Sequence, residues 1–241
     1  MSRLFPRATR APAVDRPWRD VEYCVVDVEA TGLDLRHDVL ISFGSVAVRS
    51  GRLCCETALY TDVRPGRHVS TGAVGVHGLR DRDLDSAPEL SEVIDRIVAE
   101  LDGRVLVAHA AWVERAFLTR ALRSQGRRFN APVIDTAALL RAAGLARSGT
   151  GFEPDVEAMA ESLGLCVHTP HHALGDALTT GEVFLAVVSR LERALGGPLT
   201  AYDLVDISRR HTQARRHRSG QGVTAARAVC WPRSSAPAPI V

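Results

Sequence analysis

The sequence lacks lysine altogether, and all 30 cationic side chains among its 241 residues are arginines. Its five cysteines include no CxxC pair and no Cys/His spacing of the zinc-binding kind, which argues against a disulfide framework and a structural zinc site. No apolar run approaches the roughly 18 residues of a membrane span, and the Arg-dotted start has no hydrophobic stretch of signal-peptide length. We therefore expect a soluble, cytoplasmic protein with no membrane partner.

The hydrophobic content of 46% is enough for one substantial core. The net charge of +2 conceals an asymmetry, since residues 1–20 carry +3 and residues 207–241 carry +7, which leaves −8 for the residues between them. We expect one domain at 21–197, a basic flexible N-terminal arm at 1–20 and an Arg-rich, largely flexible C-terminal arm at 198–241. Such arms either contact a polyanion or only keep the chain in solution, and the sequence leaves both interpretations open.

Apolar patterning predicts an α/β fold. Short β-rich runs predict strands at 22–28, 38–48, 51–60, 104–110 and 131–135. Runs with helical periodicity predict helices within 88–103, 111–125, 136–144, 154–165 and 172–195. Three strands followed by alternating helices and strands indicate a mixed five-stranded sheet with helices on both faces.

The segment VVDVEATGLD carries the first candidate site residues. Asp27 and Glu29 are two apart on a predicted strand, so their side chains share one face. Two carboxylates held together in a partly buried place repel each other, and a divalent cation removes that cost. The following Thr31-Gly32 turn allows backbone groups to approach a ligand. An isolated D-x-E is more often a solvated strand end, so the interpretation depends on two further segments.

Those segments are LVAHAAWVERAFL and HTPHHALGDALTT. Glu114 lies just inside a helix that follows a buried strand, where it can face the end of the first strand. In the second segment a proline precedes a helix, which places His171 at its mouth and Asp176 about a turn and a half inside. This offers a base beside a carboxylate. For His168 and His172 a structural role is the stronger interpretation.

Together the segments resemble the DEDDh branch of the DnaQ-like 3′-to-5′ exonucleases, which includes the epsilon subunit of DNA polymerase III and ribonuclease T. The resemblance covers about residues 21–195, and VVDVEATGLD and HHALGDA are similar to the family's D-x-E-x-T-G and H-x-A-L-x-D-A. It implies a ribonuclease H-like fold. The implied roles are Asp27, Glu29 and Asp176 as metal ligands, His171 as general base, and Thr31, Gly32 and Leu33 as contacts to the terminal nucleotide. Asp135 lies in a further similar stretch, VIDTAALLR, and is interpreted as a helix start or structural support.

The second motif departs from the family's pattern. Where the family has H-N-A-x-F-D, this chain has His109, Ala110 and, at the last position, Glu114. Ala110 stands in place of the asparagine and Glu114 in place of the aspartate. The negative charge is kept, but the carboxylate lies one methylene group further from the backbone. A hard cation accepts either carboxylate, and the resemblance therefore implies Glu114 as a ligand of a second metal ion.

The resemblance implies two Mg²⁺ or Mn²⁺ ions bridged by Asp27, and release of nucleoside 5′-monophosphates from single-stranded or frayed 3′ ends. DNA is the favoured substrate. A DNA polymerase subunit is a candidate partner, although the C-terminal arm shows no clear polymerase-binding motif. Two alternatives stay open. One is a 3′-to-5′ exoribonuclease, and the other is a catalytically silent nucleic-acid-binding module, suggested by the altered second motif and the Arg-rich arms.

Overall fold

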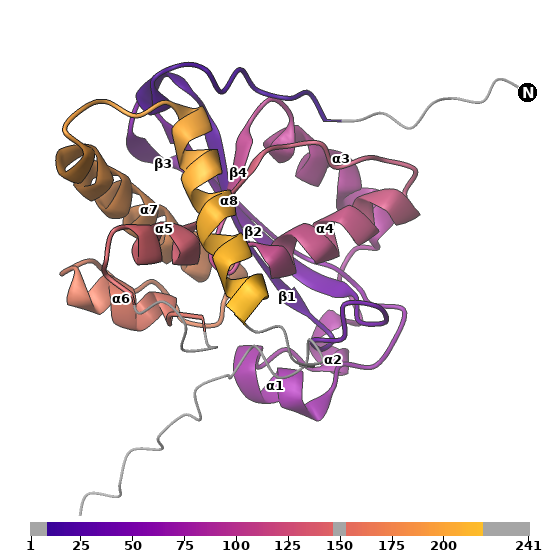
Figure 1. Ribbon diagram of the computed structural model, residues 1–241. Coiled ribbons are helices and arrows are strands. Elements are labelled where there is room, and N and C mark those ends of the chain that lie inside the picture. Colours follow the sequence, from indigo (N-terminus) through magenta and orange to yellow (C-terminus); the bar gives the residue numbers. More distant parts are fainter. Residues whose placement is uncertain (1–8, 147–152, 219–241) are drawn as a thin grey trace, which may run out of the picture.

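A mixed five-stranded sheet forms the centre of the molecule (Figure 1). The computed structural model describes residues 9–146 and 153–218. The strands are β1 (Tyr23–Ala30), β2 (Leu40–Arg49), β3 (Arg52–Asp62), β4 (Val105–Ala108) and β5 (Val133–Asp135), in the order β3-β2-β1-β4-β5. β2 is antiparallel to β1 and β3, whereas β4 is parallel to β1 and β5. The predicted mixed sheet is confirmed, with β1 at its centre.

Helices cover both faces of this sheet (Figure 1). They are the 3-10 helix η1 (Trp18–Asp20), α1 (Thr71–His77), α2 (Asp81–Leu84), α3 (Leu90–Leu101), α4 (Trp112–Ser124), α5 (Thr136–Ala142), α6 (Val156–Ser162), α7 (Ala173–Leu195) and α8 (Ala201–Arg218). Helices α3 to α7 lie where periodicity predicts them. α1 and α2 were missed because seven and four residues are too few to show a helical period. None of the described helices combines the length and apolarity of a membrane span.

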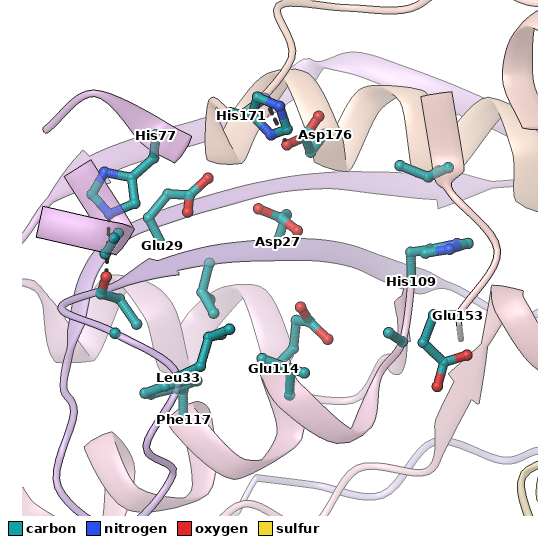
Figure 2. Close-up of a pocket in the computed structure, with 18 of the residues that line it drawn as sticks. Asp27, Glu29, Leu33, His77, His109, Glu114, Phe117, Glu153, His171 and Asp176 are labelled. Atoms are coloured by element: carbon teal, nitrogen blue, oxygen red, sulfur yellow. Dashed lines mark hydrogen bonds between the residues drawn. The ribbon is translucent and has the colours of Figure 1, made fainter. Parts of the chain in front are cut away.

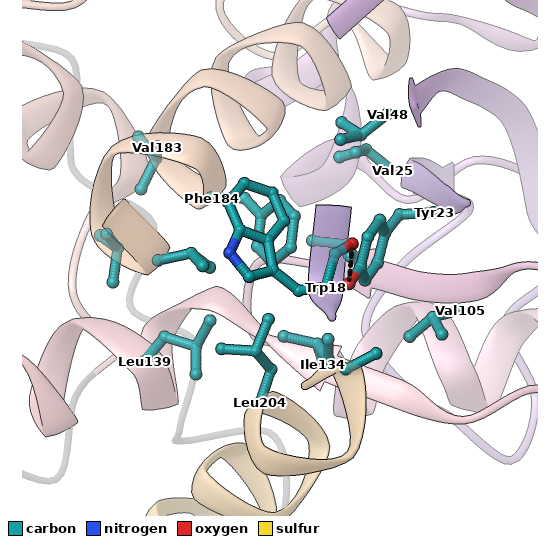
Figure 3. Close-up of a cluster of buried hydrophobic side chains, with 14 of the residues drawn as sticks. Trp18, Tyr23, Val25, Val48, Val105, Ile134, Leu139, Val183, Phe184 and Leu204 are labelled. Atoms are coloured by element: carbon teal, nitrogen blue, oxygen red, sulfur yellow. Dashed lines mark hydrogen bonds between the residues drawn. The ribbon is translucent and has the colours of Figure 1, made fainter. Parts of the chain in front are cut away.

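β1 separates two apolar layers, because its side chains alternate between the faces of the sheet. Tyr23 and Val25 join the cluster under α5, α7 and α8, together with Trp18 and Phe184 (Figure 3). The intervening residues of β1 join a second cluster, under α3 and α4. The same alternation places positions 27 and 29 on the face that α7 covers.

The start of α7 lies directly on β2 because β2 has a glycine there. Gly44 is the residue of β2 that pairs with Asp27 of β1. A Cβ atom at Gly44 would stand 2.2 Å from the carbonyl carbon of Ala173 and 2.3 Å from the nitrogen of Leu174, far inside van der Waals contact. Only glycine allows this approach of two backbones. The first turn of α7, with Asp176, is thereby brought over the Asp27 end of β1.

The described parts of the two expected arms are packed on the domain. Trp18 is only 2% exposed and meets Phe184 edge-on, with 6.2 Å between ring centroids. Leu204 of α8 is fully buried in the same cluster. Where the sequence predicted flexible arms, apolar side chains of residues 9–20 and 198–212 thus complete the layer around α7, and the backbone of α8 continues to Arg218. The rest of each arm lies outside the described residues.

We expect Trp18→Ala to lower the free energy of unfolding by about 3–5 kcal/mol, because it removes a packed ring and leaves a cavity. Urea denaturation followed by circular dichroism measures the change. Tyr202→Ala is the matched control, since Tyr202 of α8 is 58% exposed, and its effect should be about 0.5 kcal/mol or less. Equally small effects of both substitutions would contradict the packing of the N-terminal segment.

Candidate active site

Two carboxylates lie at the carboxyl end of β1. Asp27 and Glu29 both line a cavity of about 410 Å³ beneath the start of α7 (Figure 2). Glu29 is buried, with 5% of its surface exposed, while Asp27 is partly open to the cavity. The pair therefore points into a half-open pocket rather than into bulk solvent.

Asp176 joins this pair from the first turn of α7. Its Oδ2 atom accepts a 3.0 Å hydrogen bond from the backbone N–H of His171. Carboxylate oxygens of Asp27, Glu29 and Asp176 all lie within 4.8 Å of one another. The His171 backbone is left-handed, with a φ of 58°, and its ring lies beside Asp176 at the cavity (Figure 2). The structure thus gathers four predicted residues from β1 and the α7 turn.

The two histidines on either side of His171 have structural partners. His168 pairs with Glu182 of α7, with 2.9 Å between His168 Nε2 and the carboxylate. His172 stacks on Tyr60 of β3, with ring centroids 4.3 Å apart. Neither is among the residues that line the cavity. Both contacts agree with the structural interpretation of these histidines, and they hold the turn that presents His171.

Glu114 approaches the site from α4. Its side chain is 5% exposed and projects toward Asp27 (Figure 2). It is not in the group of carboxylates within 4.8 Å of one another, which Asp27, Glu29 and Asp176 form. Its Oε2 atom is buried without a hydrogen-bond partner among the described residues. Three of the predicted carboxylates are therefore gathered closely, and the fourth faces them across the cavity.

The altered second motif has visible backbone consequences. Ala110, which replaces the family's asparagine, has a left-handed backbone with a φ of 55°. Asparagine and glycine tolerate that region better than alanine, so the replacement adds strain. The His109 ring lies 2.9 Å from Thr136 Oγ1 and 2.5 Å from the carbonyl oxygen of Pro154. It ties the start of α5 to the segment before α6 and lines the cavity.

The residues after Glu29 divide into two groups. Gly32 and Leu33 line the cavity, as expected for contacts to a ligand. Thr31 is fully buried and is not among the lining residues, and its hydroxyl bonds the Asp38 carboxylate at 2.8 Å. Asp135 caps α5, because its carboxylate accepts a hydrogen bond from Ala137 N at 3.0 Å, which agrees with its interpretation as a helix start.

Burial and mutual repulsion disfavour ionisation of the site carboxylates. Burial raises the pKa of Asp27 well above its ordinary value, and the neighbouring charges of Glu29, Asp176 and Glu114 raise it further. Burial and the Asp176 charge raise the pKa of Glu29 in the same way. The pKa of Asp176 is raised to about 7, chiefly by burial and then by Glu157. The site is electrostatically strained unless positive charge is supplied.

The donor set fits divalent cations with a preference for oxygen ligands, such as Mg²⁺ or Mn²⁺. All four groups are carboxylates, and Asp176 Oδ1, like Glu114 Oε2, is buried without a hydrogen-bond partner among the described residues. Buried carboxylate oxygens normally find a partner. Asp27, Glu29 and Asp176 are therefore able to hold a divalent cation, and Glu114 faces them from the opposite wall of the cavity.

Sequence reasoning missed several residues of the cavity wall. Glu153, Asp155 and Glu157 line it around the start of α6, and His77 lines it from the end of α1. Asp155 and Glu157 fall in the helix predicted at 154–165 and Glu153 just before it, but nothing in the sequence singled them out. Glu157 Oε1 lies 3.9 Å from His171 Nε2. His77 belongs to a helix too short to be predicted, so no periodic signal indicated its placement.

Comparison with known proteins identifies the family. The family model described as an exonuclease of the RNase T type matches residues 24–184, which is most of the chain and includes every carboxylate of the site. The chain belongs to the DnaQ-like exonuclease family. A DNA polymerase III subunit epsilon-like protein of Rhodobacter capsulatus is 30% identical to this exonuclease-family chain over 192 residues. A PolC-type DNA polymerase III of Thermotoga maritima is 29% identical over 180 residues.

The matched regions are small parts of these relatives. They cover 78% and 74% of this chain, but only 27% of the Rhodobacter protein and 13% of the Thermotoga polymerase. Among solved structures, exonuclease X bound to 5′ overhanging duplex DNA has a TM-score of 0.59 at 23% identity, covering 77% of this chain and 99% of its own. Escherichia coli exonuclease I bound to single-stranded DNA has a TM-score of 0.64 at 13% identity, covering 73% and 42%. These likenesses confirm the ribonuclease H-like fold.

In a chelator, we expect the free energy of unfolding to fall as the pH rises from about 4.5 to about 7. The raised pKa values of Asp27, Glu29 and Asp176 mean that the folded state holds more protons than the unfolded state in this range, so stability declines as they are lost. Each proton contributes about 1.4 kcal/mol per pH unit. Denaturant titrations at several pH values measure the slope.

A variant of the site, a control variant and added metal show how much of this dependence of stability on pH comes from the site. Asp27→Asn removes one repelling charge, so the variant should have a shallower slope and greater stability at neutral pH in chelator than the wild type. The exposed residue Glu56 gives the control, and Glu56→Gln should leave the slope unchanged. Saturating Mg²⁺ should also flatten the wild-type slope. A wild-type protein in chelator that gained stability over this range would contradict the repulsive site.

Proposed function

We propose that this chain is a divalent-metal-dependent 3′-to-5′ exonuclease that releases nucleoside 5′-monophosphates from single-stranded or frayed 3′ ends. One observation carries the proposal. Three carboxylates from β1 and α7 converge within 4.8 Å, and a fourth faces them from α4 with a buried, unpartnered oxygen. Membership of an exonuclease family supports phosphodiester hydrolysis as the chemistry of this site.

Asp27, Glu29 and Asp176 would hold one ion, and Asp27 and Glu114 would hold the second. When bound, such ions would supply an activated water and stabilise the charge that develops on the leaving 3′ oxygen. The chain's own task is to fix the carboxylates, since Gly44 seats α7 and the His171 backbone N–H holds the Asp176 side chain.

In this proposal His171 accepts the proton of the attacking water. Its ring lines the cavity beside Asp176, where an imidazole nitrogen can act as a general base. Glu157, 3.9 Å from His171 Nε2, stabilises the imidazolium that forms. The left-handed backbone of His171 turns the ring toward the cavity while its N–H faces Asp176.

The apolar part of the cavity supports recognition of a terminal nucleotide without regard to its base. Leu33, Val113 and Phe117 line it beside the carboxylates. A base packed on an apolar wall is bound by area and stacking, which every base offers. DNA is the favoured polymer, since the matched relatives are named as DNA polymerase III proteins and the similar solved exonucleases were seen with DNA. The same names make a DNA polymerase subunit a candidate partner.

A single strand labelled at its 5′ end tests this function. With Mg²⁺ or Mn²⁺ we expect a ladder that shortens from the 3′ end and free nucleoside 5′-monophosphates, and with chelator no cleavage. Asp27→Asn and Glu29→Gln should each nearly abolish cleavage while the circular dichroism spectrum is retained, because each removes metal charge. Matched DNA and RNA strands separate the two polymers. Strand binding without nucleotide release would instead support a silent binding module.

The longer carboxylate at position 114 gives a second test. If Glu114 holds the second ion, Glu114→Ala should lower kcat by about 10²-fold or more, because developing charge loses its organised cation. Glu114→Asp should retain much more activity, since it keeps the charge. Glu161→Ala, at an exposed position of α6, is the control and should behave as wild type. Full kcat for Glu114→Ala with Mg²⁺ and with Mn²⁺ would remove Glu114 from the site.

A further inference from the structure

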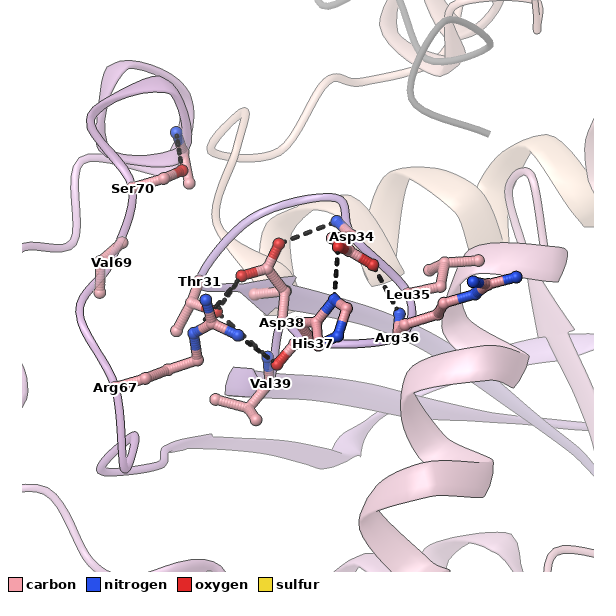
Figure 4. A network of polar contacts seen from close by, with 12 residues as sticks. Thr31, Asp34, Leu35, Arg36, His37, Asp38, Val39, Arg67, Val69 and Ser70 are labelled. Carbon is pink, nitrogen blue, oxygen red and sulfur yellow. Dashed lines mark hydrogen bonds and ion pairs between the residues drawn. The ribbon is translucent and has the colours of Figure 1, made fainter. Parts of the chain in front are cut away.

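The segment between β1 and β2 is organised around one buried carboxylate (Figure 4). Asp38 is 8% exposed and does not line the cavity of the candidate active site. Its Oδ1 accepts a 2.8 Å hydrogen bond from the Thr31 hydroxyl, and its Oδ2 accepts one of 2.8 Å from the backbone N–H of Asp34. The Thr31 hydroxyl in turn accepts a 3.1 Å hydrogen bond from Val39 N. The Asp38 carboxylate thus links the two ends of the segment between β1 and β2 through hydrogen bonds to Thr31 and Asp34.

Gly32 lies directly against this carboxylate. A Cβ atom at Gly32 would stand 2.4 Å from Asp38 Oδ2 and 2.9 Å from its carboxylate carbon. No side chain fits there unless Asp38 moves. Since Gly32 and Leu33 line the cavity, the loop has an inner edge that faces the site and an outer edge held by Asp38.

Neighbouring segments fix the loop from outside. Arg67 Nη1 donates to the carbonyl oxygen of His37 at 2.5 Å, and Arg67 Nε lies 3.7 Å from Asp38 Oδ1. Arg120 of α4 donates to the same carbonyl and to that of Leu35. These two arginines tie the loop to the segment before α1 and to the helix that carries Glu114. The placement of the loop is therefore coupled to two walls of the cavity.

We propose that Asp38 is a positioning residue for the terminal nucleotide, acting by holding Gly32 and Leu33 at the cavity wall. The proposal rests on the proposed function. The proposal also changes the roles expected for two neighbouring residues. Thr31 holds Asp38 through its hydroxyl, and Gly32 leaves room for the Asp38 carboxylate. Asp38 touches no reacting atom, so its loss weakens binding of ground state and transition state alike.

Asp38→Asn keeps the size of the side chain and removes one acceptor from the pair that Thr31 and Asp34 use. We expect KM for a DNA single strand to rise about tenfold, the effect of losing one buried hydrogen bond, with kcat changed by less than about threefold. Asp81→Asn is the matched control, since Asp81 accepts a backbone hydrogen bond from Val69 at 2.9 Å on a neighbouring segment. It should leave KM unchanged. A wild-type KM for Asp38→Asn, or a fall in kcat alone, would overturn the proposal.

The Thr31 hydroxyl gives an independent variant should Asp38→Asn unfold. Thr31→Val keeps the shape and removes the hydroxyl, so it should raise KM as Asp38→Asn does, whereas Thr31→Ser keeps the hydroxyl and should restore most of the affinity. The Kd of the same strand in Ca²⁺ is measured for every variant beside KM. If the wild type binds the strand without cleaving it, the proposed function fails, while the Kd series still decides the role of Asp38.

A double-mutant cycle separates this role from direct ligand contact at Gly32. Gly32→Ala should raise KM and Kd strongly in the wild type, because the new Cβ atom displaces Asp38. In the Asp38→Ala background the same substitution should cost much less, since the obstructing carboxylate is gone. Equal costs in both backgrounds would show that Gly32 is required by the ligand alone, and the positioning role of Asp38 would be wrong.

Discussion

The need to hold four carboxylates in one cavity at the end of an apolar strand governs this structure. Burial and like charge both disfavour the arrangement, so the rest of the fold must supply the energy that keeps it. It comes from the two apolar layers around β1, which hold the sheet and the helices together. Gly44, which pairs with Asp27 across the sheet, has no side chain and so lets the start of α7 pack directly on β2.

Local patterns in the sequence predicted much of this arrangement, because they depend on short periods. A two-residue step places Asp27 and Glu29 on one face, and helical repeats predict α3 to α7. Long-range convergence could not be predicted from such periods. That Asp176 joins β1 closely depends on how the backbones of β2 and α7 pack at Gly44, whereas the position of Glu114 depends on α4. The burial of Trp18 and Leu204 was not predicted for a related reason, since the net charge of a terminal segment gives no sign of which of its apolar side chains pack on the domain.

The Thr-Gly pair after Glu29 shows a second limit of reasoning from motifs. A motif specifies which residue types are needed at certain positions. A residue can be needed because it contacts a ligand or because it holds another residue in place. Thr31 is fully buried and bonded to Asp38, so its side chain supports the loop from within. Leu33, two positions along, lines the cavity. Only the hydrogen bonds and the close approach at Gly32 distinguish the two kinds of requirement.

The two sides of the cavity differ in a way that links metal binding to substrate binding. Glu153, Asp155 and Glu157 make one side acidic, whereas Leu33 and Phe117 make another apolar. In the proposed function, a base can pack on the apolar side, but the phosphate beside it is repelled by the cluster of Asp27, Glu29 and Asp176 until cations are bound. Phosphate affinity must then depend on metal occupancy, and thermodynamic linkage requires the reverse as well, so that a bound strand tightens the hold on the metal. A cation that relieves the repulsion among the carboxylates would thus also attract the phosphate, and this attraction would couple the two ligands.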